Sequence, residues 1–137
     1  MEKEELVAIK NTRTWPMPVR LIWVTFRKPG IHCYPEAAVN PDLADVSYLA
    51  YPHRHIFHFK VSIEVFHDNR DIEFIQFKNW LESLYDGELQ LDNKSCEMIA
   101  QELFLKIQEK YDIHTFNYRQ VVIEVSEDGE NGCEMYY

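Results

Sequence analysis

Four of the six histidines of this chain lie in one short stretch, PHRHIFHFKVSIEVFHDNRDIEF, which starts at Pro52. Residues 53–65 alternate like a β-strand, so neighbouring side chains would point to opposite faces. His53 and His55 would then share one face with their Cα atoms about 7 Å apart, close enough for both to bind one metal ion. His58 would lie on the other face, so we do not expect it to join them.

Two histidines alone do not make a metal site, because catalytic zinc is usually bound by three protein side chains and a water or substrate. His32 is the best candidate for the third ligand, since it lies where an earlier strand would lead into a long loop. His67 and His114 are expected in other turns and loops. The spacing leaves two interpretations open: a metal site formed by His32, His53 and His55, or core and surface histidines without a metal.

A second polar group lies in the segment SEDGENG, which carries the carboxylates of Glu127, Asp128 and Glu130. One interpretation is a solvent-exposed hairpin turn. In the other, Glu127 points from the end of a strand into a pocket and accepts two parallel N–H hydrogen bonds from a flat heterocycle. The spacing of a calcium-binding loop is absent.

Composition limits the classes of partner. A formal charge of −9, with scattered basic residues, argues against a nucleic-acid partner. No secretory or transmembrane segment is visible, so we expect a cytoplasmic protein without membrane contact. Three cysteines without a C-x-x-C pair argue against a disulfide framework or a zinc finger.

We expect residues 1–15 to form a flexible or loosely docked extension and residues 16–137 a single domain.

The elements that would position these residues follow from hydrophobic periodicity. We expect strands at residues 19–26, 53–65, 120–126 and 133–137, a long irregular connection from 31 to 52 with a helical turn near 42–49, and helices at 74–84 and after the N-cap Ser95. This order predicts an α+β fold, an antiparallel four-stranded sheet with two helices on one face (ββααββ). The open edges of such a sheet favour pairing with other copies of the chain.

Four segments also occur in the order of known motifs. They are HRHIF (53–57), DIEFIQFKNWLESLYD (71–86), KSCEMIA (94–100) and VVIEVSEDGENGCEMY (121–136). They are similar to the H-G-H-N-Y, G-M-V-x-D-F-x-x-L-K, P-T-x-E-N-x-A and V-x-V-x-E-T-x-x-x-x-A-x-Y motifs of the 6-pyruvoyl- and 6-carboxy-tetrahydropterin synthases. The chain therefore resembles this family of tunnelling-fold (T-fold) enzymes over about residues 19–136.

The resemblance implies a site and an assembly. It implies Zn²⁺ held by His32, His53 and His55, with Glu127 anchoring a pterin ring and Glu97 as a second substrate-binding carboxylate. It also implies sheets joined edge to edge into a barrel around a tunnel. The chain would then be a homo-oligomer, a trimer or hexamer, that binds a pterin or purine-like ligand between subunits.

The chain departs from the family at two catalytic positions. The segment VSYLAYP before HRHIF lacks the family's cysteine, and Gly87 stands where the family has a catalytic histidine. Cys33, Glu88 and His58 are the candidates left for acid and base roles. We expect a divergent zinc-dependent carbon–oxygen lyase that acts on a pterin-type substrate such as dihydroneopterin triphosphate. The alternative is a non-catalytic metal-containing T-fold protein that binds a purine, pterin or nucleotide.

Overall fold

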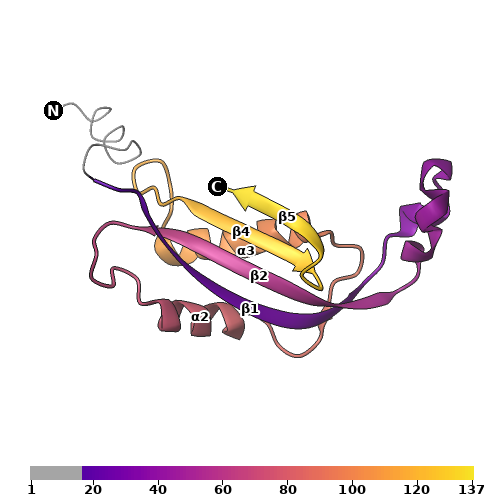
Figure 1. Ribbon diagram of the computed structural model, residues 1–137, viewed down its shortest axis with the longest axis horizontal. Coiled ribbons are helices and arrows are strands. Elements are labelled where there is room, and N and C mark those ends of the chain that lie inside the picture. Colours follow the sequence, from indigo (N-terminus) through magenta and orange to yellow (C-terminus); the bar gives the residue numbers. More distant parts are fainter. Residues whose placement is uncertain (1–16) are drawn as a thin grey trace.

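Two long antiparallel strands form the centre of the sheet (Figure 1). The computed structural model describes residues 17–137, so the extension expected at residues 1–15 lies outside the described part. β1 (Arg20–His32) and β2 (His53–Val65) pair over their full length. β4 (Val121–Glu127) pairs with β2, and β5 (Asn131–Tyr136) pairs with β4, both antiparallel.

The observed sheet corrects the expected four-stranded antiparallel ββααββ arrangement of the T-fold, which was wrong. The sheet has five strands in the order β3-β1-β2-β4-β5. β3 (Leu89–Gln90) runs parallel to β1 beside Gly30 and Ile31, so the sheet is mixed. A strand of two residues shows no alternation in the sequence, and only its pairing in the folded chain reveals it. The fold class is α+β with one parallel pair of strands.

β1 is longer than the expected strand at residues 19–26. The segment RKPG (27–30), which lies beyond that expected strand, continues the pairing with β2. Gly30 lies directly across from His55, and a Cβ atom at Gly30 would come within 2.8 Å of the ring of Phe57. The glycine therefore serves a close approach between neighbouring strands. As a result β1 extends to His32.

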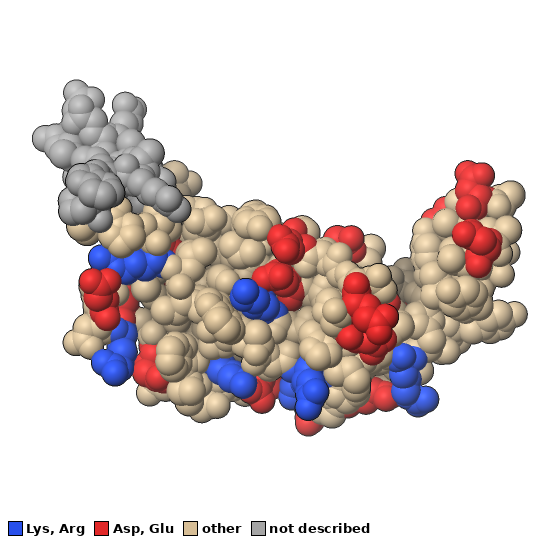
Figure 2. Space-filling model, viewed as in Figure 1, with Lys and Arg blue, Asp and Glu red and all other residues tan. Residues whose placement is uncertain are grey.

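The connection between β1 and β2 protrudes from the body of the molecule (Figure 1). It contains two 3₁₀ segments, η1 (Pro35–Ala38) and η2 (Pro41–Ala50), where the sequence predicted a helical turn at residues 42–49. η2 has no buried residue. All charged residues of η1 and η2 are acidic, and they are seen as red groups on the protrusion (Figure 2).

The two α-helices begin at side-chain caps. α2 (Phe74–Ser83) starts where the carboxylate of Glu73 accepts a hydrogen bond from the N–H of Gln76 at 2.7 Å. α3 (Cys96–Tyr111) starts at the expected N-cap, because the hydroxyl of Ser95 accepts from the N–H of Met98 at 3.2 Å. No helix within residues 17–137 is long and apolar enough to cross a membrane.

Both helices pack against the same face of the sheet. The core joins Phe77 and Leu81 of α2 and Leu103 of α3 to the alternating apolar residues of β2, among them Phe59 and Val61. Phe74 of α2 and Met98 of α3 do not belong to this core and are each 52% exposed. They lie at the first turns of their helices. The helix-bearing face of β2 is also the face that carries His53 and His55 at its start.

Candidate metal centre

The paired ends of β1 and β2 bring three histidines together. His32, the last residue of β1, lies directly across from His53, the first residue of β2. The ring centroid of His32 lies 4.6 Å from that of His53 and 5.3 Å from that of His55, and the last two lie 5.0 Å apart. One ligand nitrogen from each ring lies within 4.8 Å of the other two. This arrangement is compatible with a metal ion.

Each imidazole is oriented by an oxygen at its Nδ1 atom. The oxygens are the carbonyl of Lys94 for His32 (2.9 Å), the carbonyl of Tyr51 for His53 (2.8 Å) and Oδ2 of Asp128 for His55 (2.7 Å). Carbonyl and ionised carboxylate oxygens only accept hydrogen bonds, so each Nδ1 must carry the donated proton. In a neutral ring this leaves a free lone pair on Nε2. Metal-binding histidines are commonly held in this way through their other nitrogen.

The buried Nε2 atom of His55 makes no hydrogen bond to any of the residues 17–137. Leaving a buried polar atom unpaired costs about 1–3 kcal/mol. Such atoms are rare in folded proteins, and a bound ion is one way in which they are satisfied. Imidazole nitrogens bind zinc, copper, iron and nickel. The residues present therefore fit a metal ion held by three Nε2 atoms.

The turn between β4 and β5 holds Asp128 beside His55. Asp128 and Gly129 both have positive φ angles, 58° and 70°, as in a type I′ hairpin turn. The N–H of Asp128 donates to the carbonyl of Ile56 at 2.8 Å, and the N–H of Ile56 donates to Oδ1 of Asp128 at 2.9 Å. The Ile56 N–H, and then His55, hold the pKa of Asp128 below its usual value. Asp128 is thus ionised at neutral pH and can orient His55.

Glu127, the last residue of β4, lies against the same nitrogens. Its Oε1 atom is 3.4 Å from Nε2 of His32, and its Oε2 atom is 3.2 Å from Nε2 of His55. The second contact lacks hydrogen-bond geometry, so the nitrogen stays unpaired in spite of the short distance. With neutral imidazoles, three acceptor groups face one another here. The role of Glu127 as a ring anchor stays a prediction.

A cavity of about 420 Å³ opens beside the histidines. Its lining includes His32, His53 and three predicted candidates, Cys33, Glu97 and Glu127. Cys96 also lines it, and burial, with a smaller contribution from the charge of Glu127, raises the pKa of this thiol to about 12. At neutral pH Cys96 is therefore a protonated thiol and a poor nucleophile. The cavity has the volume of a typical small-molecule site.

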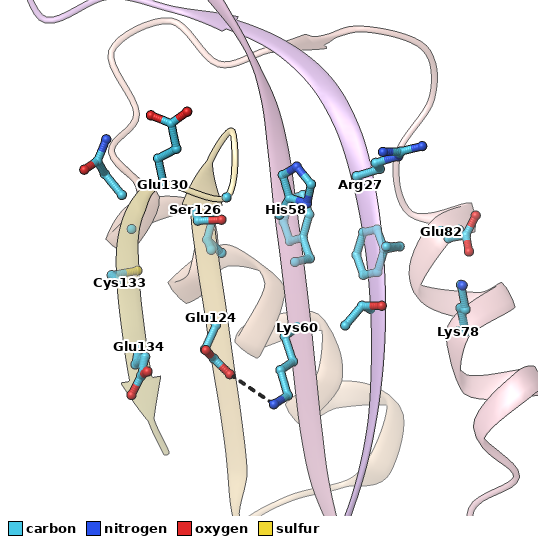
Figure 3. Close-up of a pocket in the computed structure, with 17 residues that line it drawn as sticks. Arg27, His58, Lys60, Lys78, Glu82, Glu124, Ser126, Glu130, Cys133 and Glu134 are labelled. Carbon is cyan, nitrogen blue, oxygen red and sulfur yellow. Dashed lines mark ion pairs between the residues drawn. The ribbon is translucent and has the colours of Figure 1, made fainter.

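The other two predicted catalytic residues lie away from this cavity. His58 projects from the opposite face of β2 and lines an open cavity of about 990 Å³, next to Lys60 (Figure 3). In that cavity Lys60 lies 3.8 Å from Glu124, so charges of the two signs compensate each other. Glu88 accepts a hydrogen bond from Arg54 at 2.9 Å. Arg54 and His58 lie on the same face of β2, because side chains alternate along a strand. Glu88, which binds Arg54, therefore lies on that side of β2 and not beside the three histidines.

Asp128 is the residue of the centre whose role the sequence did not reveal. The sequence marked it only as one carboxylate of an acidic turn. The available signal was the dipeptide Asp128–Gly129 directly after a strand, which is typical of a hairpin turn. Such a turn fixes the direction of its first side chain. That this side chain reaches His55 depends on the pairing of β4 with β2, which the sequence does not show.

No protein-family model matches this sequence, and neither does any curated protein. The resemblance to tetrahydropterin synthases therefore rests on motif order and stays a prediction. What bears on function is the geometry of the histidine cluster and of the cavity beside it.

Proposed function

We propose that this chain is a zinc-dependent enzyme whose metal centre consists of His32, His53 and His55. Its substrate would be a small polar molecule held in the 420 Å³ cavity. The pterin-type substrate implied by the family resemblance, with dihydroneopterin triphosphate as the specific example, is the candidate to test first. The reaction class would be carbon–oxygen bond cleavage.

One observation carries the proposal: three imidazoles, each held by an oxygen at Nδ1, offer one ligand nitrogen apiece within 4.8 Å of the other two. Three protonated imidazoles at ring separations of 4.6–5.3 Å would repel one another. A proton shared between His55 and Glu127 could satisfy one nitrogen, but not all three. A single divalent cation satisfies all of them at once, and three histidines with an open position suit zinc.

The residues around the cavity supply the remaining functions. A zinc ion would polarise an oxygen of the substrate. Cys33, whose backbone N–H is fixed by the carbonyl of Asp92 at 2.8 Å, follows His32 in the chain and lines the same cavity, so its thiol is our candidate for proton transfer to the substrate. Glu97, in the first turn of α3, offers a carboxylate to N–H groups of the substrate.

A second candidate function is binding without catalysis. It is favoured by the placement of the acid and base candidates, because His58 and Glu88 lie on the other face of β2. Cys96 cannot replace them, since its thiol stays protonated at neutral pH. In this case the centre would hold a purine, pterin or nucleotide beside the metal.

Elemental analysis followed by a turnover assay tests the proposal. We expect about one zinc ion per purified chain, lost in His53→Ala and His55→Ala. We also expect turnover of dihydroneopterin triphosphate that disappears in Cys33→Ala. Tight binding without turnover would support the second candidate. A purified wild-type chain that carries and takes up no zinc would contradict both.

Self-association is a separate proposal. β5 is the last strand in the sheet order and pairs only with β4 among the described strands, so its outer edge is available for pairing. We propose that the chain forms a homo-oligomer, and sedimentation at micromolar concentration tests this. A monomer would contradict it without affecting the metal site.

A further inference from the structure

The position of Glu127 goes beyond a three-histidine centre. Its two carboxylate oxygens lie 3.4 Å and 3.2 Å from Nε2 of His32 and His55. Two ligands that bind one metal at about 2.1 Å with a near-tetrahedral angle are about 3.4 Å apart. The carboxylate therefore lies at the distance from the two nitrogens that a ligand of the same ion would have.

The neighbouring lysine and arginine side chains form ion pairs with other carboxylates. Lys94 lies 3.1 Å from Glu102, and Arg54 lies 2.9 Å from Glu88. Within residues 17–137, the ion pairs of Glu127 are formed with histidines alone. A carboxylate beside two imidazoles that donate through Nδ1 needs a cation or a shared proton between them. A divalent ion supplies the charge that the described residues do not.

The backbone of Glu127 is fixed, but its side chain has room. Glu127 pairs with Phe57 of β2 and with Asn131 of β5, so its Cα position is held on both sides. Its side chain is 28% exposed and lines the cavity, whereas the side chain of His32 is 9% exposed. The carboxylate can thus move between the three histidines and the cavity without a change in the sheet.

We propose that Glu127 is the fourth ligand of the metal, a carboxylate that occupies the remaining position and leaves when another ligand enters. This inference rests on the proposed three-histidine metal centre. It assigns Glu127 to the metal rather than to a heterocyclic ring. It also implies that ligands reach the ion only in competition with this carboxylate.

Cobalt substitution provides the test, because the visible spectrum of Co²⁺ reports its ligands and azide is a simple competing anion. The comparison uses wild type, Glu127→Gln, Glu127→Asp and the control Glu130→Gln, which alters an exposed carboxylate in the same turn. We expect both Glu127 variants to change the cobalt spectrum and to weaken Co²⁺ binding about tenfold or more. Glu127→Gln should bind azide about tenfold more tightly than wild type, and Glu130→Gln should match wild type in all three measurements.

The outcomes separate this inference from the proposal on which it rests. If Co²⁺ binds the wild type and both Glu127 variants with the same spectrum and affinity, Glu127 is not a ligand, while the three-histidine centre stands. If the wild type does not bind Co²⁺ at all, both proposals are wrong. Far-UV circular dichroism of each variant shows that the comparison is made on folded protein.

Discussion

The two ends of β2, about 40 Å apart along a strand of 13 residues, satisfy their polar groups in different ways. At the far end, Asp71 accepts hydrogen bonds from the N–H of Phe66 at 2.9 Å and from Arg119 at 3.1 Å. There the buried Glu64 accepts from the N–H of Gln120 at 3.0 Å. Each of these carboxylates faces a donor from the chain itself.

At the near end, acceptors face acceptors. With neutral imidazoles, Nε2 of His32 and of His55 and the carboxylate of Glu127 converge, and the buried Nε2 of His55 has no hydrogen bond among the described residues. At the far end, Asp71 and Glu64 have donors from the chain itself, so we assign these carboxylates a structural role. The near end leaves a buried acceptor unpaired among the described residues, so it is the end at which we propose a bound cation and expect function.

The largest effect should come from removing one of the three imidazoles. We expect His32→Ala, His53→Ala or His55→Ala to weaken zinc binding by more than about 100-fold. Loss of a ligand should cost more affinity than loss of a group that only orients a ligand, which typically costs about 10- to 100-fold. Isothermal titration of the metal-free protein measures this. His58→Ala is the matched control, since it removes an imidazole from the opposite face of the same strand. Equal losses in His58→Ala would contradict the assignment.

A smaller effect should follow from loosening His55. We expect Asp128→Asn to weaken zinc binding about 10- to 100-fold, because an amide orients and polarises the imidazole less well than a carboxylate. Asp112→Asn is a matched control, as Asp112 also has a positive φ, 51°, and lies 3.7 Å from a histidine at the end of α3. Competition with a fluorescent zinc chelator gives both affinities. Unchanged binding in Asp128→Asn would remove its positioning role.

The far end should respond in stability and not in metal binding. We expect Asp71→Asn to lower the free energy of unfolding by about 1–2 kcal/mol, because the charged partner of Arg119 is lost. Urea unfolding of the metal-free protein measures this, with Asp45→Asn on the protruding connection as a control. Zinc affinity should stay at the wild-type value. A loss of zinc affinity in Asp71→Asn would break the comparison between the two ends.

The smallest expected effect is the pH dependence of the difference in free energy of unfolding between wild type and Asp71→Asn. Burial alone would raise the pKa of Asp71, but the hydrogen bonds from Phe66 and Arg119 outweigh it and hold the pKa below its usual 3.8. A lowered pKa means that this stabilisation is fully present above the unfolded pKa and is lost as the pH falls through the folded pKa. The difference between wild type and Asp71→Asn should therefore shrink below about pH 5. A difference that grows with acidity would contradict the sign.

The residues that the sequence placed correctly are those with a short-range signal. Alternation along residues 53–65 separated His53 and His55 from His58, and the cap at Ser95 followed from local preference. The position of His32 beside them needed only that two neighbouring strands pair. These are inferences within one strand or between adjacent ones.

What the sequence could not show depends on pairings between distant segments. β3 is two residues long and is defined by its contact with β1, so the five-stranded mixed sheet was not predictable from periodicity. The approach of Glu127 and Asp128 to His55 depends on the register between β2 and β4. Hydrophobic patterning determines which face a residue takes, but not which residue of another strand lies opposite.

The most direct test of the metal centre is an anomalous difference map at the zinc absorption edge, from crystals of the protein prepared with zinc. We predict one strong peak at about 2.0–2.1 Å from the Nε2 atoms of His32, His53 and His55. A map without a peak between these three residues, or with zinc bound only elsewhere on the chain, would contradict the proposed metal centre.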